Sequence, residues 1–232
     1  MLGGSRSTTA ALGAGPSSSR VVAAFDFDGT MTTHDTFRLF LREAFGWQRV
    51  ARECSRLLPA FASFSISNRD QLKERLLFAL LQHQPVAPWH AFAQRFQPKL
   101  RALLRLGVID QLRWHQACGH RCVMVSASLD LYLAPIAKEF GFDNLLCTRL
   151  QTDPRREPVD GFPAVPRHED RFTGHLVGVN CRRQEKVNRL TALLGDLSQY
   201  EMYAYGDSVG DKEMLAVAQH PFFRHYPSGA LE

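Results

Sequence analysis

The stretch "AAFDFDGTMT", residues 23–32, places two carboxylates one residue apart, directly after an apolar run and directly before a glycine turn. The apolar run, "VVAAFDF" at 21–27, is short and bounded by Gly29, which favours a buried parallel strand over a helix. Two carboxylates near a core repel each other and cost free energy. Their presence here therefore indicates that a cation or a chemical step requires them. Asp26 and Asp28 therefore mark a candidate site at the end of a strand.

Strand and helix signals alternate along the rest of the chain. "HRCVMVSAS" at 120–128 repeats the strand signal, and "LDLYLAPIAKEFG" continues as a helix closed by Gly141. "NLLCTRL" is another short strand, and "RFTGHLVGV" at 171–179 is expected to return as its hairpin partner. "RRQEKVNRLTALLG" predicts a helix, "YEMYAYGD" a strand and "DKEMLAVAQH" a helix. This order predicts an α/β fold with a doubly wound, Rossmann-like, mainly parallel sheet and helices on both of its faces.

A helical segment interrupts this alternation. Between residues 35 and 115, apolar residues recur at three- and four-residue steps, which predicts three to five helices and no strand. An insertion just after the first strand would lie over the carboxyl ends of the strands, where open α/β sheets bind ligands. The predicted organisation is a loose tail at 1–20, a core domain at 21–34 and 116–232, and an all-α cap at 35–115.

Composition excludes several classes of protein. Of the 232 residues, 45% are hydrophobic and 22% are charged, which is typical of a globular chain. Five cysteines without a CxxC pair predict reduced thiols, with neither a disulfide framework nor a zinc knuckle. No apolar run approaches the roughly 18 residues of a membrane-spanning helix, and the tail has no signal-peptide core, so we expect no transmembrane segment and a cytoplasmic location.

The net charge of +5 is concentrated in one segment. Residues 31–110 hold twelve Lys or Arg and six Asp or Glu, whereas the remainder of the chain is close to neutral. Such a segment attracts an anionic substrate, an acidic membrane surface or nucleic acid, although arginine-rich helices are also often only solvated faces. The chain has no nucleic-acid motif, so we expect no nucleic-acid partner.

Several chemically complementary residues follow predicted strand ends or begin helices. Asp26, Asp207 and Asp211 would repel strongly if the sheet brings them together, and a divalent cation with Lys186 would relieve that repulsion. Hard oxygen ligands without imidazole or thiolate indicate Mg²⁺ as the cofactor.

The spacing of the first two carboxylates suggests the reaction. Asp26 would attack phosphorus to give an aspartyl phosphate, while Asp28 protonates the leaving oxygen and later deprotonates water. Ser126, with the amides of Ala127 and of Ser128 opening a helix, would bind phosphate oxygens. Lys186 would neutralise the transferring group.

Together these residues resemble the haloacid dehalogenase superfamily of phosphatases, in its phosphoserine-phosphatase-like branch with a helical cap after the first strand. "DFDGT" is similar to the nucleophile motif of that family, "VMVSAS" to its phosphate-binding strand, "CRRQEK" to its lysine segment and "GDSVGD" to its acidic motif. The resemblance covers about residues 21–223. It implies that Asp26 and Asp207 hold Mg²⁺ by their side chains and Asp28 by its carbonyl, and that Asp211 supports the metal waters or the lysine. It also implies phosphate contacts from Gly29, Thr30, Ser126, Ala127 and Lys186.

The substrate is less defined than the chemistry. In the phosphoserine branch an acidic residue nine positions after the nucleophile binds the substrate amine; here it is Asp35, which is shorter than the usual Glu and equally suits a helix N-cap. Other segments look more like a bacterial subgroup that includes phosphatidylglycerophosphate phosphatases. In those lipid-directed members the cap carries a long apolar stretch; here "LLPAFASFSI" at 57–66, beside Arg49, Arg52 and Arg56, would either enter a membrane interface as a peripheral contact or pack as cap core.

Three functions remain open from the sequence. The first is a Mg²⁺-dependent phosphomonoester hydrolase acting on a small or lipid-linked phosphate. The second is a phosphotransferase, in which a hydroxyl group and not water accepts the phosphoryl group. The third is a signalling protein switched by phosphorylation of an aspartate; receiver domains of that kind lack an eighty-residue helical insert and do not need Asp28.

Overall fold

The computed structural model describes residues 20–57, 66–155, 162, 167 and 169–224. The predicted tail lies outside these residues except for Arg20, which begins the first strand. The apolar stretch at 57–66 lies outside them except for its two end residues. The proline-rich loop that follows residue 155 lies mostly outside them as well.

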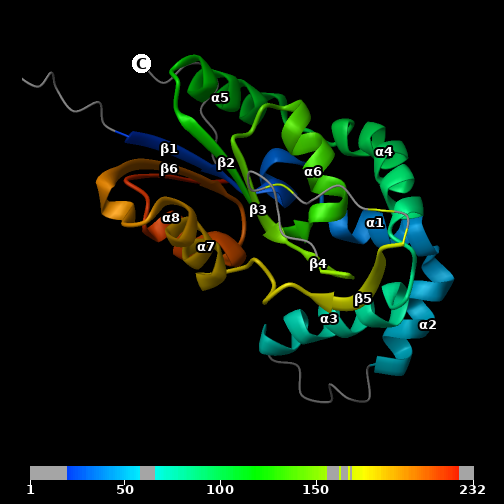
Figure 1. Cartoon of the computed structure of the whole chain (residues 1–232). Helices are drawn as coiled ribbons and strands as arrows, with labels where there is room; N and C mark the ends of the chain where they lie inside the picture. The colour runs from blue at the N-terminus through cyan, green and yellow to red at the C-terminus, as the bar shows by residue number, and fades with distance from the viewer. Residues whose placement is uncertain (1–19, 58–65, 156–161, 163–166, 168, 225–232) are drawn as a thin grey trace, which may run out of the picture.

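A five-stranded sheet forms the centre of the molecule (Figure 1). Its order is β3-β2-β1-β6-β7, and every neighbouring pair is parallel. The strands are β1 Arg20–Phe25, β2 Arg121–Leu129, β3 Asn144–Thr148, β6 Tyr200–Gly206 and β7 His220–Phe223. The predicted α/β fold with a parallel sheet is confirmed, and β7 is an edge strand that the sequence analysis did not predict.

Helices cover both faces of the sheet because the strands are apolar on both sides. Ala23 and Phe25 of β1 pack into one cluster with α5 (Leu106–Ala117) and α6 (Asp130–Glu139). Val22 and Ala24 face the other way, into a cluster with α7 (Gln184–Leu194) and α8 (Lys212–Ala216). Alternate residues of β1 therefore pack against the helices on opposite faces of the sheet.

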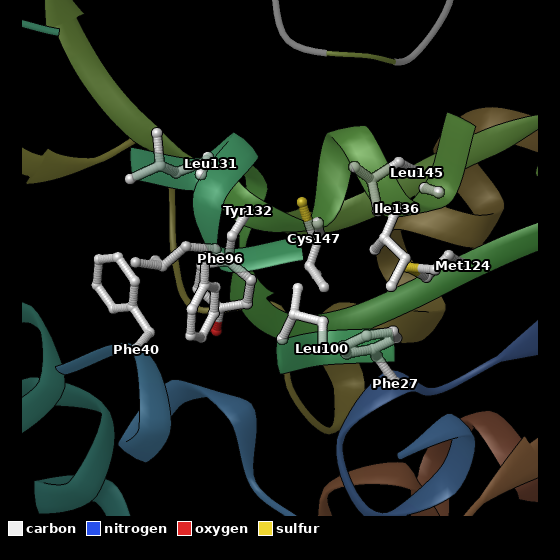
Figure 2. Close-up of a cluster of buried hydrophobic side chains, with 14 of the residues drawn as sticks. Phe27, Phe40, Phe96, Leu100, Met124, Leu131, Tyr132, Ile136, Leu145 and Cys147 are labelled. Atoms are coloured by element: carbon white, nitrogen blue, oxygen red, sulfur yellow. The ribbon is translucent and has the colours of Figure 1, made fainter. Parts of the chain in front are cut away.

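Helices also make up the described part of the predicted cap. They are α1 Thr36–Phe45, α2 Trp47–Leu57, α3 Ile66–Leu81 and α4 Ala87–Arg101, followed by α5. Phe40 of α1, Phe96 and Leu100 of α4 and Tyr132 of α6 share one buried apolar cluster (Figure 2). Because α5 packs against β2, we propose that the cap ends near Arg105, before α5, although the sequence analysis extended it to residue 115. None of the helices that the structure describes is long and apolar enough to cross a bilayer.

A separate β-hairpin packs against the cap. β4 (Leu150–Asp153) pairs antiparallel with β5 (Arg171–Leu176), and β5 lies along α3. The predicted partner of the returning segment was "NLLCTRL". Most of that segment is β3, which pairs with β2 at one edge of the main sheet, so the hairpin pairing begins only at its last residue, Leu150. Hydrogen bonds from the His83 amide to the Phe172 carbonyl (2.8 Å) and from the Phe172 amide to the Gln84 carbonyl (2.9 Å) tie the hairpin to the turn after α3.

Candidate active site

Asp26 directly follows β1, at the point of the sheet where the strand order reverses. β2 and β3 lie on one side of β1 and β6 on the other, so the carboxyl ends of β1 and β6 border the crevice at which such sheets bind ligands. The Asp26 amide donates to the Tyr205 carbonyl (2.9 Å), which holds the ends of these strands together. After Asp26 the chain turns sharply through Phe27–Met31, with Gly29 at φ 77°.

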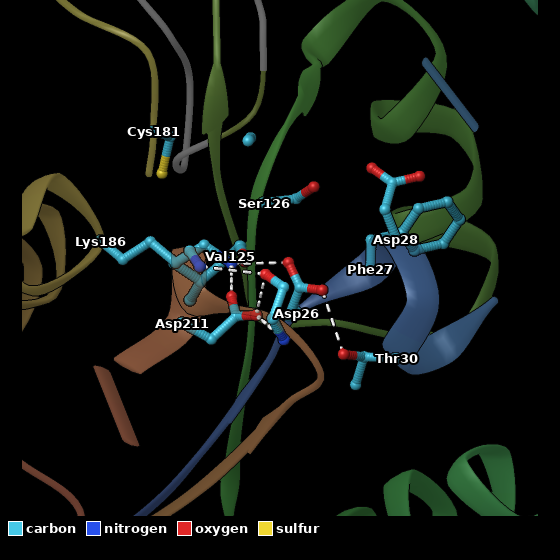
Figure 3. Close-up of polar contacts among 12 residues, drawn as sticks. Asp26, Phe27, Asp28, Thr30, Val125, Ser126, Cys181, Lys186 and Asp211 are labelled. Carbon is cyan, nitrogen blue, oxygen red and sulfur yellow. Dashed lines mark hydrogen bonds and ion pairs between the residues drawn. The ribbon is translucent and has the colours of Figure 1, made fainter. Parts of the chain in front are cut away.

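Lys186 joins two of the predicted carboxylates (Figure 3). Its ammonium donates to Asp26 Oδ1 (2.5 Å), to Asp211 Oδ1 (2.5 Å) and to the Val125 carbonyl (2.8 Å). The Lys186 side chain is 2% exposed, so these contacts are shielded from solvent. Asp26 after β1, Val125 of β2 and Asp211 after β6 therefore converge on the buried ammonium group of Lys186 in α7.

The charges of this group are strongly interdependent. Burial raises the pKa of Asp26, Lys186 opposes this, and the neighbouring carboxylates of Asp211 and Asp28 add to it. Burial would also raise the pKa of Asp211, but Lys186 and hydrogen bonds from Ser208 bring it below its usual value. Burial would lower the pKa of Lys186, yet the two carboxylates raise it, so the lysine stays charged. A further cation would favour the ionised form of Asp26.

Asp207 completes a group of three carboxylates that are close enough together to hold one metal ion. Carboxylate oxygens of Asp26, Asp207 and Asp211 lie within 4.8 Å of one another. Asp211 Oδ2 already accepts from the amides of Asp207 (3.3 Å) and Ser208 (3.0 Å) and from the Ser208 hydroxyl (2.8 Å). In contrast, no residue that the structure describes donates a hydrogen bond to the half-buried carboxylate of Asp207, and its pKa is raised by burial and by Asp211. These unshared oxygens fit Mg²⁺, which prefers one or two carboxylates and retains waters.

Gly29 leaves room for the Asp207 carboxylate. A Cβ atom at Gly29 would lie 2.3 Å from Asp207 Oδ2, which is shorter than any real contact. The glycine is therefore required both by its positive φ and by the close approach of the two motifs. A phosphate contact from Gly29 stays a prediction.

Asp28 lies apart from the lysine cluster. Its Oδ1 accepts from the amide (2.6 Å) and the hydroxyl (2.5 Å) of Thr36, and its Oδ2 accepts from the hydroxyl of Ser128. In Figure 3 the carboxylate of Asp28 points away from Asp26 and Lys186. Burial raises the pKa of Asp28, and the bonds from Ser128 and Thr36 oppose that rise. The metal contact predicted for its carbonyl stays a prediction.

The phosphate-binding segment differs from its prediction in one respect. Ala127 and Ser128 do not open a helix, because β2 continues to Leu129 through an irregularity in its pairing with β3, and α6 begins at Asp130. Ser126 is buried, and its hydroxyl accepts from the Ser128 amide (3.0 Å).

Two other residues of the predicted phosphate site contact their neighbours, Thr30 through its hydroxyl and Ala127 through its carbonyl, which is not the amide predicted to bind phosphate. The Thr30 hydroxyl donates to Asp26 Oδ2 (3.0 Å), so it orients the predicted nucleophile. The Ala127 carbonyl accepts from Lys73. Direct phosphate contacts of Thr30, Ser126 and Ala127 stay predictions.

Lys73 of α3 is a site residue that the sequence analysis missed. Besides Ala127, its ammonium contacts Asn180 Oδ1 (2.8 Å), and it lies 4.7 Å from the centre of the Phe37 ring. Burial lowers the pKa of Lys73 to about 8, while Asp28 and other acidic residues oppose this. Nothing in the sequence distinguishes this lysine from the other basic residues of the helical segment.

Asp35 caps α1. Its Oδ1 accepts from the amides of Phe37 (2.9 Å) and Arg38 (3.2 Å), so the N-cap alternative is confirmed. The binding of a substrate amine by Asp35 stays a prediction.

Known proteins are similar to this chain in sequence and in structure. The family model described as haloacid dehalogenase-like hydrolase matches residues 23–216. Protein CicA of Caulobacter vibrioides is 37% identical over 228 residues, which cover 96% of this chain and 92% of that protein. A protein of unknown function from Bordetella pertussis Tohama I has a similar structure, with a TM-score of 0.64 and 26% identity over 86% of this chain and 87% of that one.

A substrate-bound phosphoserine phosphatase complex shares the fold, with a TM-score of 0.52 and 16% identity over 87% of this chain and 84% of that one. The matched region contains every site residue described above, from Asp26 to Asp211. The chain therefore belongs to the haloacid dehalogenase-like hydrolases, and its fold is similar to that of phosphoserine phosphatase.

Proposed function

We propose that this protein is a Mg²⁺-dependent phosphomonoester hydrolase that works through an aspartyl phosphate on Asp26. The observation that carries the proposal is the buried Lys186 ammonium between Asp26 and Asp211, next to the unshared carboxylate of Asp207. Asp26 and Asp207 would hold Mg²⁺, which when bound supplies positive charge to the phosphate oxygens. We also propose that the protein is located in the cytoplasm.

In the first step Asp26 is the nucleophile. A carboxylate oxygen of Asp26 forms a bond to phosphorus while the bond from phosphorus to the ester oxygen breaks. Asp28 gives its proton to the leaving oxygen, so the product is a neutral alcohol. Thr30 and Lys186 orient the attacking carboxylate through the hydrogen bonds that they donate to it.

In the second step Asp28 acts as a base. It takes a proton from a water molecule as the water oxygen bonds to phosphorus, and the bond between phosphorus and Asp26 breaks. Inorganic phosphate leaves, Asp26 returns to a carboxylate and Asp28 is protonated again. Lys186 neutralises charge on the transferring group in both steps.

Hydrolysis of p-nitrophenyl phosphate tests this proposal. We expect turnover with Mg²⁺, loss of turnover in EDTA and its return when Mg²⁺ is restored. Asp26→Asn is expected to abolish turnover while circular dichroism and gel filtration stay as in the wild type. Full activity of Asp26→Asn, or full activity in EDTA, would contradict the assigned nucleophile or the assigned metal. A screen of phosphorylated metabolites, including phosphoserine and phosphatidylglycerophosphate, would then define the substrate.

One observation favours a lipid-linked substrate as a second candidate. Trp47, at the start of α2, is 64% exposed, and with Arg49, Arg52 and Phe45 it lines a hollow of about 390 Å³ on the cap. An exposed tryptophan among arginines suits an anionic membrane surface. We expect the protein to co-sediment with vesicles that contain phosphatidylglycerol and not with pure phosphatidylcholine vesicles. Trp47→Ala is expected to weaken this binding, whereas Leu106→Ala, at a 79% exposed position of α5, is the matched control.

A further inference from the structure

We infer that Thr36 and Ser128 are positioning residues that fix which oxygen of Asp28 carries the catalytic proton. The inference rests on the proposed function, because it concerns the proton that Asp28 gives and takes. Three donors reach the Asp28 carboxylate: the amide and hydroxyl of Thr36 at Oδ1, and the hydroxyl of Ser128 at Oδ2. They come from different parts of the molecule, since Thr36 begins the cap helix α1 and Ser128 lies near the end of β2.

The two oxygens of Asp28 are not equivalent. A backbone N–H can only donate, so the Thr36 amide reserves one position of Oδ1 in both protonation states of the acid. The Thr36 hydroxyl occupies a second position of the same oxygen at 2.5 Å. The amide and the hydroxyl of Thr36 therefore fill both lone-pair positions of Oδ1 and leave no position there for a proton.

Oδ2 accepts from one donor, the hydroxyl of Ser128, and no other residue that the structure describes donates to it. One of the two lone-pair positions of Oδ2 is therefore open. The proton of the acid is assigned to this open position, where it can pass to the leaving oxygen while Ser128 continues to donate to the other position. The hydrogen bond from Ser128 thus holds Oδ2, and the direction of its O–H bond, in one orientation.

Burial makes these bonds difficult to replace. Thr36 is 0% exposed and Ser128 is 2% exposed, so bulk water does not reach the positions of their hydroxyl groups. Loss of either hydroxyl leaves the carboxyl group of Asp28 with fewer fixed donors and a wider range of orientations. The step that suffers is proton transfer, because it depends on the direction of the O–H bond.

A comparison of leaving groups tests the inference. p-Nitrophenolate leaves without protonation, whereas the benzyl alcohol oxygen needs a proton. For Ser128→Ala and Thr36→Val we expect kcat/KM to fall about 100-fold with benzyl phosphate, within the range of general acid catalysis, and less than about 5-fold with p-nitrophenyl phosphate. Thr36→Ser keeps a hydroxyl group at this position, so the ratio of kcat/KM between the two substrates is expected to stay at its wild-type value.

The second half of the reaction gives an independent readout. Because Asp28 also activates water, the aspartyl phosphate is expected to accumulate in Ser128→Ala, which gives a burst of p-nitrophenolate followed by a lowered kcat. If Thr36→Val fails to fold, Ser128→Ala carries the test alone.

Two kinds of failure are distinguishable. An equal loss with both substrates, or an unchanged ratio in an active and folded Ser128→Ala variant, would overturn the positioning role while leaving the proposed function intact. If Asp26→Asn retained full activity, the proposed function itself would fail.

Discussion

Replacement of Lys186 by methionine tests the centre of the site. Lys186→Met keeps most of the volume of the side chain and removes an ammonium that contacts two buried carboxylates, each at 2.5 Å. At an effective dielectric of 20, two unit charges at that distance attract by about 7 kcal/mol before the cost of desolvation is subtracted. Removal of one partner of a buried ion pair costs about 3–5 kcal/mol in practice. We expect the free energy of unfolding in EDTA at pH 8 to fall by this amount.

Urea unfolding followed by circular dichroism measures the loss. Lys99→Met is the matched control, because Lys99 pairs with Glu43 but its side chain is 52% exposed, and such surface pairs contribute about 0–1 kcal/mol. The loss of stability in Lys186→Met is expected to become smaller as the pH falls. Without the lysine, burial raises the pKa of both Asp26 and Asp211, so the two carboxylates bind protons and become neutral in the folded variant.

Mg²⁺ is expected to restore part of the stability of Lys186→Met by binding the folded state. Activity is expected to fall about 100- to 1000-fold, as for loss of one charge-stabilising donor. If Lys186→Met were as stable as Lys99→Met in EDTA, the two short contacts would not be ion pairs in solution, and the account of the site would be refuted.

Two further predictions follow from other parts of the molecule. Gly29→Ala is expected to weaken Mg²⁺ binding at least about 10-fold, measured by titration of the melting temperature, because the added Cβ would displace Asp207. Gly119→Ala is the control, since Gly119 has a similar φ of 71° and open space around it. This control is expected to lose only about 1 kcal/mol of stability, the backbone cost of a side chain at positive φ. Normal Mg²⁺ affinity in Gly29→Ala would show that Asp207 is not a ligand. Burial, with His120 as a neighbour, lowers the pKa of His115 to about 3, so its contribution to stability is complete above about pH 6.5 and decreases as the pH falls below it. We expect the wild type to lose roughly 2 kcal/mol more than His115→Gln between pH 7 and pH 5 in urea unfolding, and parallel pH profiles would contradict this.

Much of the sheet was predictable because its strands are continuous apolar runs. The runs before Asp26 and before Ser126 predict β1 and β2 within a few residues. β7 was not predicted because His220–Phe223 is an edge strand of four residues with alternating partial exposure, which looks like a loop in the sequence. The β4–β5 hairpin was predicted one strand too early, because "NLLCTRL" contains no turn signal between β3 and β4.

The candidate site was predictable only where motifs follow strand ends or begin helices. Asp26, Asp207 and Asp211 converge because the doubly wound topology brings the strand ends to one crevice, and Lys186 reaches them from the first turn of α7. Lys73 was not predictable, because it reaches the site through the packing of α3, which spacing along the chain does not encode. The contacts of Thr36 and Ser128 with Asp28 depend in the same way on how the cap meets the core.

The hydrogen bonds between the β4–β5 hairpin and the turn after α3 restrict how the cap moves. The cap is joined to the sheet by the chain on either side of it and, in addition, by the bonds of His83 and Gln84 to Phe172 and of the Val86 amide to the Asp170 carbonyl (2.9 Å). A rotation of α3 therefore carries the hairpin with it or breaks these bonds together. In hydrogen–deuterium exchange, the amides of His83, Val86 and Phe172 would then exchange as one cooperative unit, and the hinge of the enzyme would lie at the base of the hairpin as well as at the ends of the inserted helices.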